Sequence, residues 1–239
     1  MKQRLREQVA KACRIVGKLE LTRSMNGHVS ARVPGTDTLL IRARGPGESG
    51  VRFTSADDVI LVDLDGRKLE GREELDPPME VFIHCGIYRA RPEVNAVLHT
   101  HPATVVLFTI CNKPLLPLFG AYDPSCLRLL AEGIPTFPRS VLVSNPALGR
   151  ELAAVMGHSP ACLMRGHGIT TCGSSIESAV LTAVKLNELA EMNYRARLLG
   201  DPVPIPEDEL AAFTTGRQAN DPYDAPMWRY YCRLLGEEE

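Results

Sequence analysis

The segment Val94–Pro102, with the sequence VNAVLHTHP, constrains the fold of this chain more than any other. Its β-branched and apolar residues predict a strand, and Pro102 ends that strand because proline cannot donate to a sheet ladder. Successive side chains of a strand point to opposite faces, so His99 and His101 share one face at its end. The two imidazoles are candidate metal ligands, although histidine pairs also occur in cores and on surfaces for structural reasons.

A third histidine follows another short apolar run. His167 lies between two glycines in the sequence RGHG, and glycine permits the tight backbone that aims a side chain into a cleft. Upstream, Pro77 and Pro78 can start a helix that has Glu80 in its first turn. Three imidazoles and a carboxylate suit a divalent transition metal, zinc first and manganese, cobalt or iron as alternatives.

The rest of the sequence predicts an alternation of helices and strands without internal repeats or low-complexity linkers. Apolar spacing and turn residues predict helices over 3–19, 79–90, 103–111, 147–156 and 175–199, and strands over 28–33, 38–43, 58–63 and 140–144. Residues 45–50 and 115–124 are expected to be loops. We therefore expect a single domain over residues 1–239 with one substantial core.

Bulk properties exclude several classes of protein. A net charge of −2 and a pI near 6.3 provide no electrostatic footprint for nucleic acid or an anionic membrane. The first residues have apolar positions at helical spacing rather than a signal-peptide core, and no run approaches the roughly 20 apolar residues of a membrane span. Seven scattered cysteines without a CxxC pair argue against a disulfide framework and for a cytoplasmic location.

The order of these motifs resembles the class II aldolase/adducin family. Glu80, then IYRARPEVNAVLHTHP and RGHGITTCGSSIESAV carry the resemblance, and LELTRSMNGHVSARVPG and SADDVILVDLDGRKLEG extend it over most of the chain. It implies a single-domain, three-layer α/β/α fold with a central, largely antiparallel sheet, assembled as a homotetramer with active sites between subunits. It also implies that His99, His101 and His167 hold the metal, and that Glu80 serves as acid/base and can reach the metal.

The chain departs from the family's sugar-phosphate aldolases where those enzymes bind phosphate. They typically carry a serine pair immediately before the glutamate, whereas this chain has Pro77 and Pro78, which offer neither a hydroxyl nor an N–H. They carry Gly-Asn-x-Ser where this chain has Gly27-His28-Val29-Ser30. A pocket without the phosphate cradle can instead receive a carboxylate, which guanidinium groups match with paired hydrogen bonds.

Candidate residues for substrate and proton transfer follow from this comparison. The proposed substrate contacts are Ser30, Arg32, Arg165 and Tyr122, with Arg42 or Arg44 as further arginines. Arg165 is favoured by its place two residues before His167, although solvated surface is the alternative for every arginine. Glu80 and His28 are the candidates for the catalytic proton donor. His84, four residues after Glu80, is interpreted as structural.

The resemblance is strongest to family members that decarboxylate dihydroxylated aromatic acids, through GHVSAR, FGAYDP and RGHG. Aldol cleavage and decarboxylation both leave an electron pair that a divalent Lewis acid can stabilise. We therefore expect a non-oxidative decarboxylase of aromatic catabolism with a substrate such as 3,4-dihydroxyphthalate. The alternatives are decarboxylation of a ring-cleavage product, aldol cleavage of a sugar phosphate or hydroxy-keto acid, and a non-catalytic adducin-like module.

Overall fold

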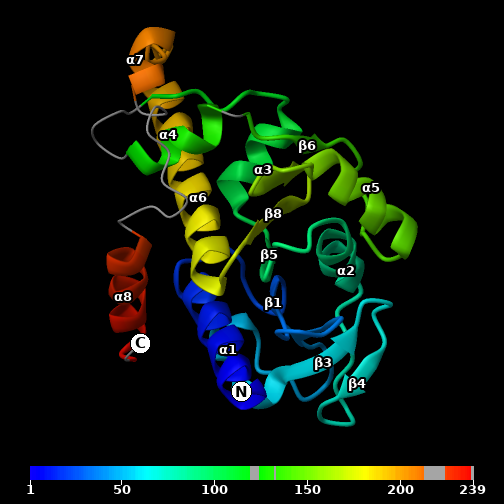
Figure 1. Cartoon of the computed structure of the whole chain (residues 1–239). Helices are drawn as coiled ribbons and strands as arrows, with labels where there is room; N and C mark the ends of the chain where they lie inside the picture. Colours follow the sequence, from blue (N-terminus) through cyan, green and yellow to red (C-terminus); the bar gives the residue numbers. More distant parts are fainter. Residues whose placement is uncertain (119–123, 132, 213–223, 238–239) are drawn as a thin grey trace.

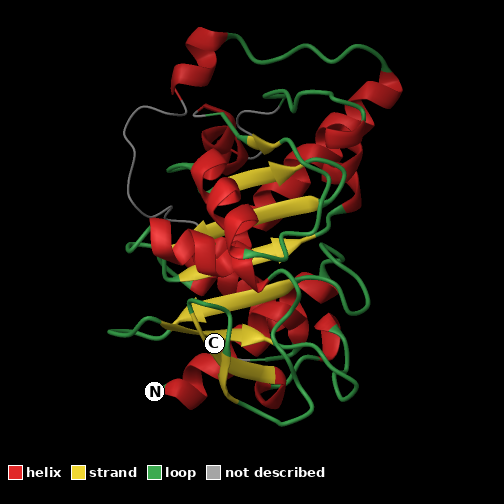
Figure 2. Cartoon of the chain, turned by 90° about the vertical axis from the view of Figure 1, so that its right-hand side faces the viewer, coloured by secondary structure: helices red, strands yellow, loops and turns green. Residues whose placement is uncertain are grey.

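The structure, a computed structural model, describes residues 1–118, 124–131, 133–212 and 224–237. These residues form an eight-stranded sheet with the order β4-β3-β2-β1-β5-β8-β7-β6. The strands are β1 (His28–Arg32), β2 (Thr38–Arg42), β3 (Val59–Asp63), β4 (Lys68–Glu70), β5 (Ala96–Thr100), β6 (Thr136–Phe137), β7 (Ala161–Met164) and β8 (Gly168–Gly173). Figure 2 shows the strands stacked through the middle of the molecule.

The sheet is largely antiparallel, as the family resemblance implies. Within the described strands, β6 and β7 form the parallel pair and all other neighbours are antiparallel. The predicted strand that ends in the histidine pair is β5, which lies between β1 and β8 and has every residue buried. A strand buried on both faces requires helices on both sides of the sheet.

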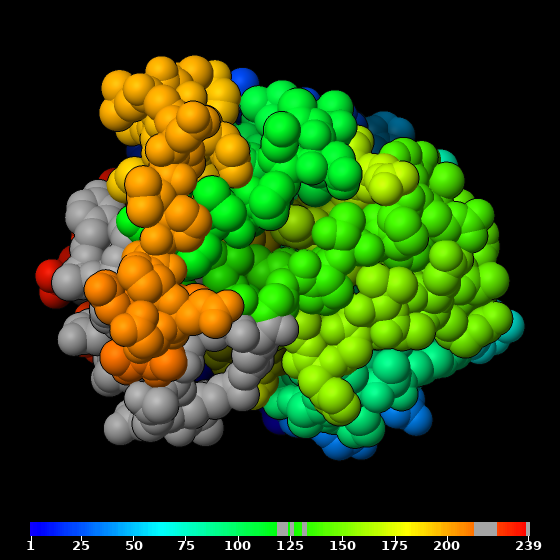
Figure 3. Space-filling view, turned by 90° about the horizontal axis from the view of Figure 1, so that it is seen from above, coloured from blue at the N-terminus to red at the C-terminus, as the bar shows by residue number. Residues whose placement is uncertain are grey.

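Helices cover both faces and complete the expected three layers (Figure 1). One layer contains α1 (Lys2–Lys18), α3 (Ala103–Ile110), α6 (Ile176–Leu199) and α8 (Asp224–Leu235), and the other contains α2 (Val81–Ala90) and α5 (Pro146–Met156). Along β5, Leu98 packs into the core of the first layer and Val97 into that of the second. Seen from above, α7 (Glu207–Ala212) and the end of α6 lie on one side of the molecule (Figure 3).

Most predicted helix boundaries are confirmed to within two residues. Asn145 caps α5 by accepting from the N–H of Leu148, and Ser175 caps α6 by accepting from the N–H of Ser178. The helix predicted from residue 79 begins at Val81, so Glu80 occupies the N-cap position rather than the first turn. That position lets the Glu80 side chain leave the helix end toward the sheet.

The strand predicted over residues 140–144 is wrong. The chain pairs with β7 only over Thr136–Phe137 and leaves the sheet at Pro138, which has no N–H to donate. Beyond it, Val143 donates its backbone N–H to Glu80, and the Ser140 hydroxyl donates to the carbonyl oxygen of Arg165. The apolar residues 141–143 therefore belong to a loop beside the histidines and not to a strand.

The predicted loop over residues 115–124 is described only in part, and the candidate substrate contact Tyr122 lies outside the described residues. Near the C-terminus, Trp228 and Tyr231 of α8 are buried in the core between α1 and α6. Among the described helices, none combines the length and apolar character that a membrane span requires.

Two glycines allow α2 to pack closely against α5. A Cβ atom on Gly86 would collide with the carbonyl oxygen of Gly149, and one on Gly149 would collide with the carbonyl oxygen of Phe82. Backbone atoms cannot rotate away as a flexible side chain can. This contact fixes the position of the helix that presents Glu80 and His84.

We predict that Gly86→Ala destabilises the protein, although alanine is the better helix former by about 1 kcal/mol. Overpacking against backbone should cost about 1–3 kcal/mol, which corresponds to a lower melting temperature by several degrees. Gly47→Ala is the matched control, because a Cβ atom there meets chiefly the mobile end of the Arg72 side chain. Equal melting temperatures for both variants would contradict this account of the helix contact.

Candidate metal centre

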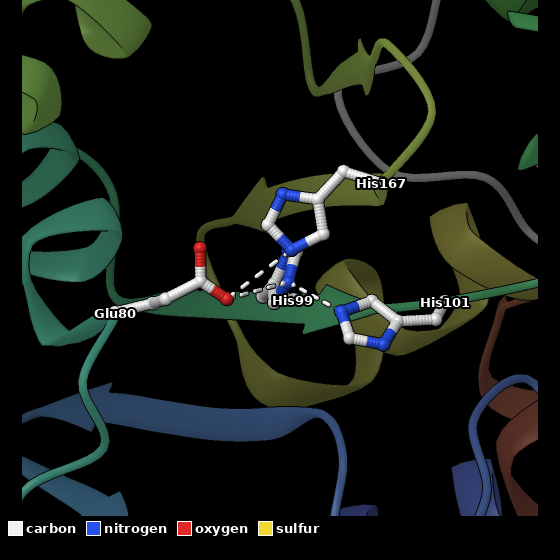
Figure 4. Close-up of side chains that lie close together, drawn as sticks. All are labelled: Glu80, His99, His101 and His167. Atoms are coloured by element: carbon white, nitrogen blue, oxygen red, sulfur yellow. Dashed lines mark hydrogen bonds and ion pairs between the residues drawn. The ribbon is translucent and has the colours of Figure 1, made fainter. Parts of the chain in front are cut away.

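His99 and His101 lie side by side at the end of β5, as the strand period predicts. Their Nε2 atoms are 2.9 Å apart, and the two rings meet edge to face with centroids 4.8 Å apart. His99 is completely buried, whereas His101 retains some exposed surface beyond the strand. Two ring nitrogens at this separation point to one common position, as Figure 4 shows.

His167 is aimed at the same position by the tight turn between β7 and β8. Met164 and Gly168 pair across this hairpin, and Gly166 between them has a positive φ of 59° that favours glycine. A Cβ atom on Gly168 would collide with the carbonyl oxygen of Thr100, so this glycine lets β8 approach β5. The ring centroid of His167 consequently lies 4.9 Å from that of His99 and 5.1 Å from that of His101.

Glu80 completes the group from the N-terminal end of α2. Its Oε2 atom lies 3.2 Å from Nε2 of His167 and 3.4 Å from Nε2 of His99. Its Oε1 atom accepts the backbone N–H of Val143 at 2.9 Å, which fixes the orientation of the carboxylate. One candidate ligand atom from each of the four residues lies within 4.8 Å of the other three.

The protonation states of these residues suit metal ligation. Burial lowers the pKa of His99, and it lowers the pKa of His101 to about 3. Burial alone would raise the pKa of Glu80, but the adjacent His167 and His99 rings outweigh it and hold this pKa well below the usual range. The group therefore places a carboxylate of low pKa beside the imidazoles of His99 and His101, whose pKa values are also lowered.

Two hydrogen-bonding details test whether a metal fits these residues. Nδ1 of His99 lies 3.0 Å from the carbonyl oxygen of Ile169 and must donate its proton there, which leaves the Nε2 lone pair for a ligand. Nε2 of His167 is fully buried and has no hydrogen bond of acceptable geometry among the described residues. A cation at the shared position would satisfy both atoms and the charge of Glu80. The residues thus fit a divalent transition metal.

Beside this group lies a buried chain of polar side chains that the sequence analysis did not foresee as a unit. His28 is the register partner of His99, and its ring centroid lies 5.2 Å from that of His99. Nδ1 of His28 is 2.7 Å from Nε2 of His84, whose Nδ1 is 2.6 Å from the Ser30 hydroxyl. That hydroxyl is 2.8 Å from the Tyr88 hydroxyl. We call these four residues the polar relay.

The polar relay includes Ser30, which the sequence analysis proposed as a substrate contact, and Tyr88, which it did not consider. The Ser30 side chain is completely buried and bonds His84 and Tyr88, so its hydroxyl is directed to α2 rather than to the metal ligands. Sequence reasoning missed Tyr88. Its signal was the four-residue spacing from Glu80 to His84 to Tyr88, which aligns all three on one face of the helix.

The arginines that the sequence analysis proposed as substrate contacts lie in different surroundings from one another. The structure does not bring Arg32 to the metal ligands, because its guanidinium donates to carbonyl oxygens of Tyr88 and Val94 and lies over the Tyr88 ring. Arg42 is buried and bonded to Thr54, Met25, Gly27 and Glu48. Arg44 is partly exposed near Glu48, and Arg165 is exposed beside the His167 turn, at a cavity of about 600 Å³.

Comparison with known proteins agrees with this fold and this group of ligands. The family model for the class II aldolase and adducin N-terminal domain matches residues 7–194. The chain belongs to the class II aldolase and adducin family. This membership confirms the family expected from the motif order and accounts for the α/β/α layers and the sheet order described above.

Two curated relatives are 3,4-dihydroxyphthalate decarboxylases. The one from Terrabacter sp. (strain DBF63) is 40% identical over 236 residues and covers 97% of each chain. The one from Arthrobacter keyseri is 40% identical over 210 residues, which are 86% of this chain and 84% of the relative. Among solved structures, an aldolase II superfamily protein from Pseudomonas syringae is 25% identical with a TM-score of 0.85, and the match covers 98% of this chain and 92% of that one.

We predict that His101→Ala or His167→Ala lowers zinc affinity by at least about tenfold, because each variant removes one of the three imidazoles that would hold the ion. The measurement is the zinc content after dialysis against a weak chelator, determined by plasma mass spectrometry. His158→Ala is the control, since His158 is exposed on the loop after α5. Full zinc retention by the two ligand variants would show that the metal binds elsewhere.

Proposed function

We propose that this protein is a metal-dependent carboxy-lyase that decarboxylates a dihydroxylated aromatic acid, with 3,4-dihydroxyphthalate as the first candidate substrate. The observation that carries the proposal is the 40% identity, over 97% of both chains, to a decarboxylase of that acid. The intact ligand group of Glu80, His99, His101 and His167 supports an active lyase rather than a non-catalytic module.

The chemistry of the site suits this reaction. A divalent metal, when bound, supplies a Lewis acid that stabilises negative charge on substrate oxygens. Glu80 is ionised and can take the proton of a substrate hydroxyl, then return it to the ring carbon that loses its carboxyl group. As that carbon gains a proton, its bond to the carboxylate breaks and carbon dioxide leaves. The net reaction consumes one proton and needs no oxidant.

The residues that precede α2 agree with a substrate that carries no phosphate group. Pro77 and Pro78 stand where the family's aldolases carry hydroxyls, and the carbonyl oxygen of Pro78 accepts the N–H of Val81. On the other side, the carbonyl oxygen of Gly27 accepts from Arg42. Pro77 and Pro78 therefore supply neither the hydroxyls nor the N–H groups that a phosphate group would accept from at this position. A sugar-phosphate aldolase is therefore the second candidate.

Recognition of the substrate carboxylates is proposed for Arg165, which is exposed and two residues from His167. We also propose zinc as the metal, a role in aromatic catabolism in the cytoplasm, and a homotetramer in which Tyr122 contributes to the pocket. Exposed apolar residues near the site support assembly, because Leu107 and Ile110 of α3 and Val141 and Leu142 of the loop between β6 and α5 remain uncovered in one chain.

The direct test is incubation of the zinc-loaded protein with 3,4-dihydroxyphthalate. We expect one mole each of carbon dioxide and a dihydroxybenzoate per mole of substrate, with release abolished by EDTA and by His99→Ala. L-Fuculose 1-phosphate, assayed in parallel, should not be cleaved. Aldehyde formation from the sugar phosphate, without carbon dioxide from the aromatic acid, would instead establish an aldolase. Inactivity on both, at full zinc occupancy, would direct the search to ring-cleavage acids.

We further predict that Glu80→Gln lowers turnover by at least about a hundredfold, because an amide cannot carry the proton. Zinc should remain bound, since three imidazoles still hold it. Glu93→Gln is the matched control on an exposed carboxylate and should retain full activity. Loss of zinc from the Glu80 variant would mean that this residue serves chiefly as a ligand.

A further inference from the structure

The polar relay has a direction that its end groups determine. It runs from the Tyr88 hydroxyl through Ser30 and His84 to His28, with contacts of 2.8, 2.6 and 2.7 Å. Tyr88 is 2% and His28 3% exposed, and the two residues between them are completely buried. Each contact holds one proton, so the relay can point either toward His28 or toward Tyr88.

The Tyr88 end decides between these two directions. In the described part of the chain, the Tyr88 hydroxyl has Ser30 as its hydrogen-bond partner and no other. If Ser30 donated to Tyr88, the buried phenol proton would have no acceptor. If Tyr88 donates to Ser30, the one proton left without a described partner is on Nε2 of His28, which is not among the fully buried unpartnered atoms. An unpaired donor costs less at this accessible nitrogen, which substrate or solvent can reach, than at the buried Tyr88 hydroxyl, so the relay points from Tyr88 toward His28.

The protons of both histidines follow from that direction. Ser30 donates to Nδ1 of His84, which must therefore carry its proton on Nε2 and donate it to Nδ1 of His28. With this direction, Nδ1 of each ring accepts a hydrogen bond and carries no proton, so each ring holds one proton and is neutral. The single proton of His28 is then on Nε2, an atom that no described residue binds.

His28 and the neighbouring candidate ligand His99 carry their protons on opposite ring nitrogens. His99 donates from Nδ1 to Ile169 and presents the lone pair of Nε2, whereas His28 presents an N–H from Nε2. The two rings stand on adjacent strands as register partners and share one face of the sheet. A lone pair on His28 would compete for the cation, and a charged imidazolium would be repelled by it. A neutral N–H does neither.

We propose that Tyr88, Ser30 and His84 are positioning residues that hold His28 as a neutral hydrogen-bond donor to an anionic oxygen of the substrate, and that His28 is not a fourth imidazole ligand. The part of this proposal that concerns substrate rests on the proposed function. The part that concerns the proton of His28 stands on the hydrogen bonds alone.

The proton can be located without any turnover. Solid-state NMR of the zinc-loaded protein with ¹⁵N-histidine resolves protonated from unprotonated ring nitrogens whatever the size of the assembly, and the chain has six histidines to assign. The His28 and His84 signals are assigned from their Gln variants. We expect protons on Nε2 of both residues. A proton on Nδ1 of His28, or a zinc-bound His28 nitrogen, would overturn the proposal even if the enzyme decarboxylates its substrate.

Two substitutions of His84 then test the consequence for the substrate. Leucine removes the donor to His28, whereas glutamine can place an amide N–H near the same position. With 3,4-dihydroxyphthalate, we expect kcat/KM to fall at least about tenfold in His84→Leu and to recover most of that loss in His84→Gln, with zinc content unchanged in both. His158→Leu is the exposed control.

Equal activity of His84→Leu and the wild type would contradict the proposal, and so would a glutamine variant that is folded but no better than leucine. If His84→Leu does not fold, the NMR assignment of the His28 proton and the activity of His84→Gln still test the proposal. Absence of decarboxylation in the wild type would remove the proposed function but leave the location of the His28 proton testable.

Discussion

The pairing of β5 with β1 and β8 is the constraint on which the rest of this structure depends. It sets His28, His99 and Thr170 in register across three neighbouring strands. Because side chains alternate with a period of two, a slip of one residue would turn His99 to the opposite core. The β7–β8 turn, which carries His167, is connected directly to that register. The strand ladder thus brings together ligands that are far apart in the sequence.

Burial determines how this arrangement can act. A dry environment disfavours charged imidazoles, and the lowered pKa values of His99 and His101 express that cost. The same environment would disfavour the Glu80 carboxylate, yet contacts with His99 and His167 keep it ionised. An ionised carboxylate beside imidazole nitrogens is an electrostatic environment that a divalent cation would satisfy. Ionisation of the buried glutamate and binding of a metal at this candidate site would therefore support each other.

Sequence reasoning predicted the site where short-range geometry determines it. The HxH pair follows from the strand period, and the RGHG turn follows from the freedom of glycine. It missed the relay because Ser30, His84 and Tyr88 meet through contacts 54 and 58 residues apart in the sequence. It assigned a strand to residues 140–144 because their apolar side chains resemble one, while the N–H of Val143 is committed to Glu80. It assigned Arg32 to substrate because nothing in the sequence reveals the carbonyl oxygens that it binds.

His99, His101, His167 and Glu80 are the candidate ligands of one metal centre. X-ray absorption spectroscopy at the zinc edge of the reconstituted protein tests this assignment most directly, because it measures the ligand atoms and their distances. We predict three imidazole nitrogens at about 2.0–2.1 Å together with one or two oxygens at about 2.0–2.2 Å. Sulfur at about 2.3 Å, or a shell of oxygen atoms without the outer scattering of imidazole rings, would contradict the account.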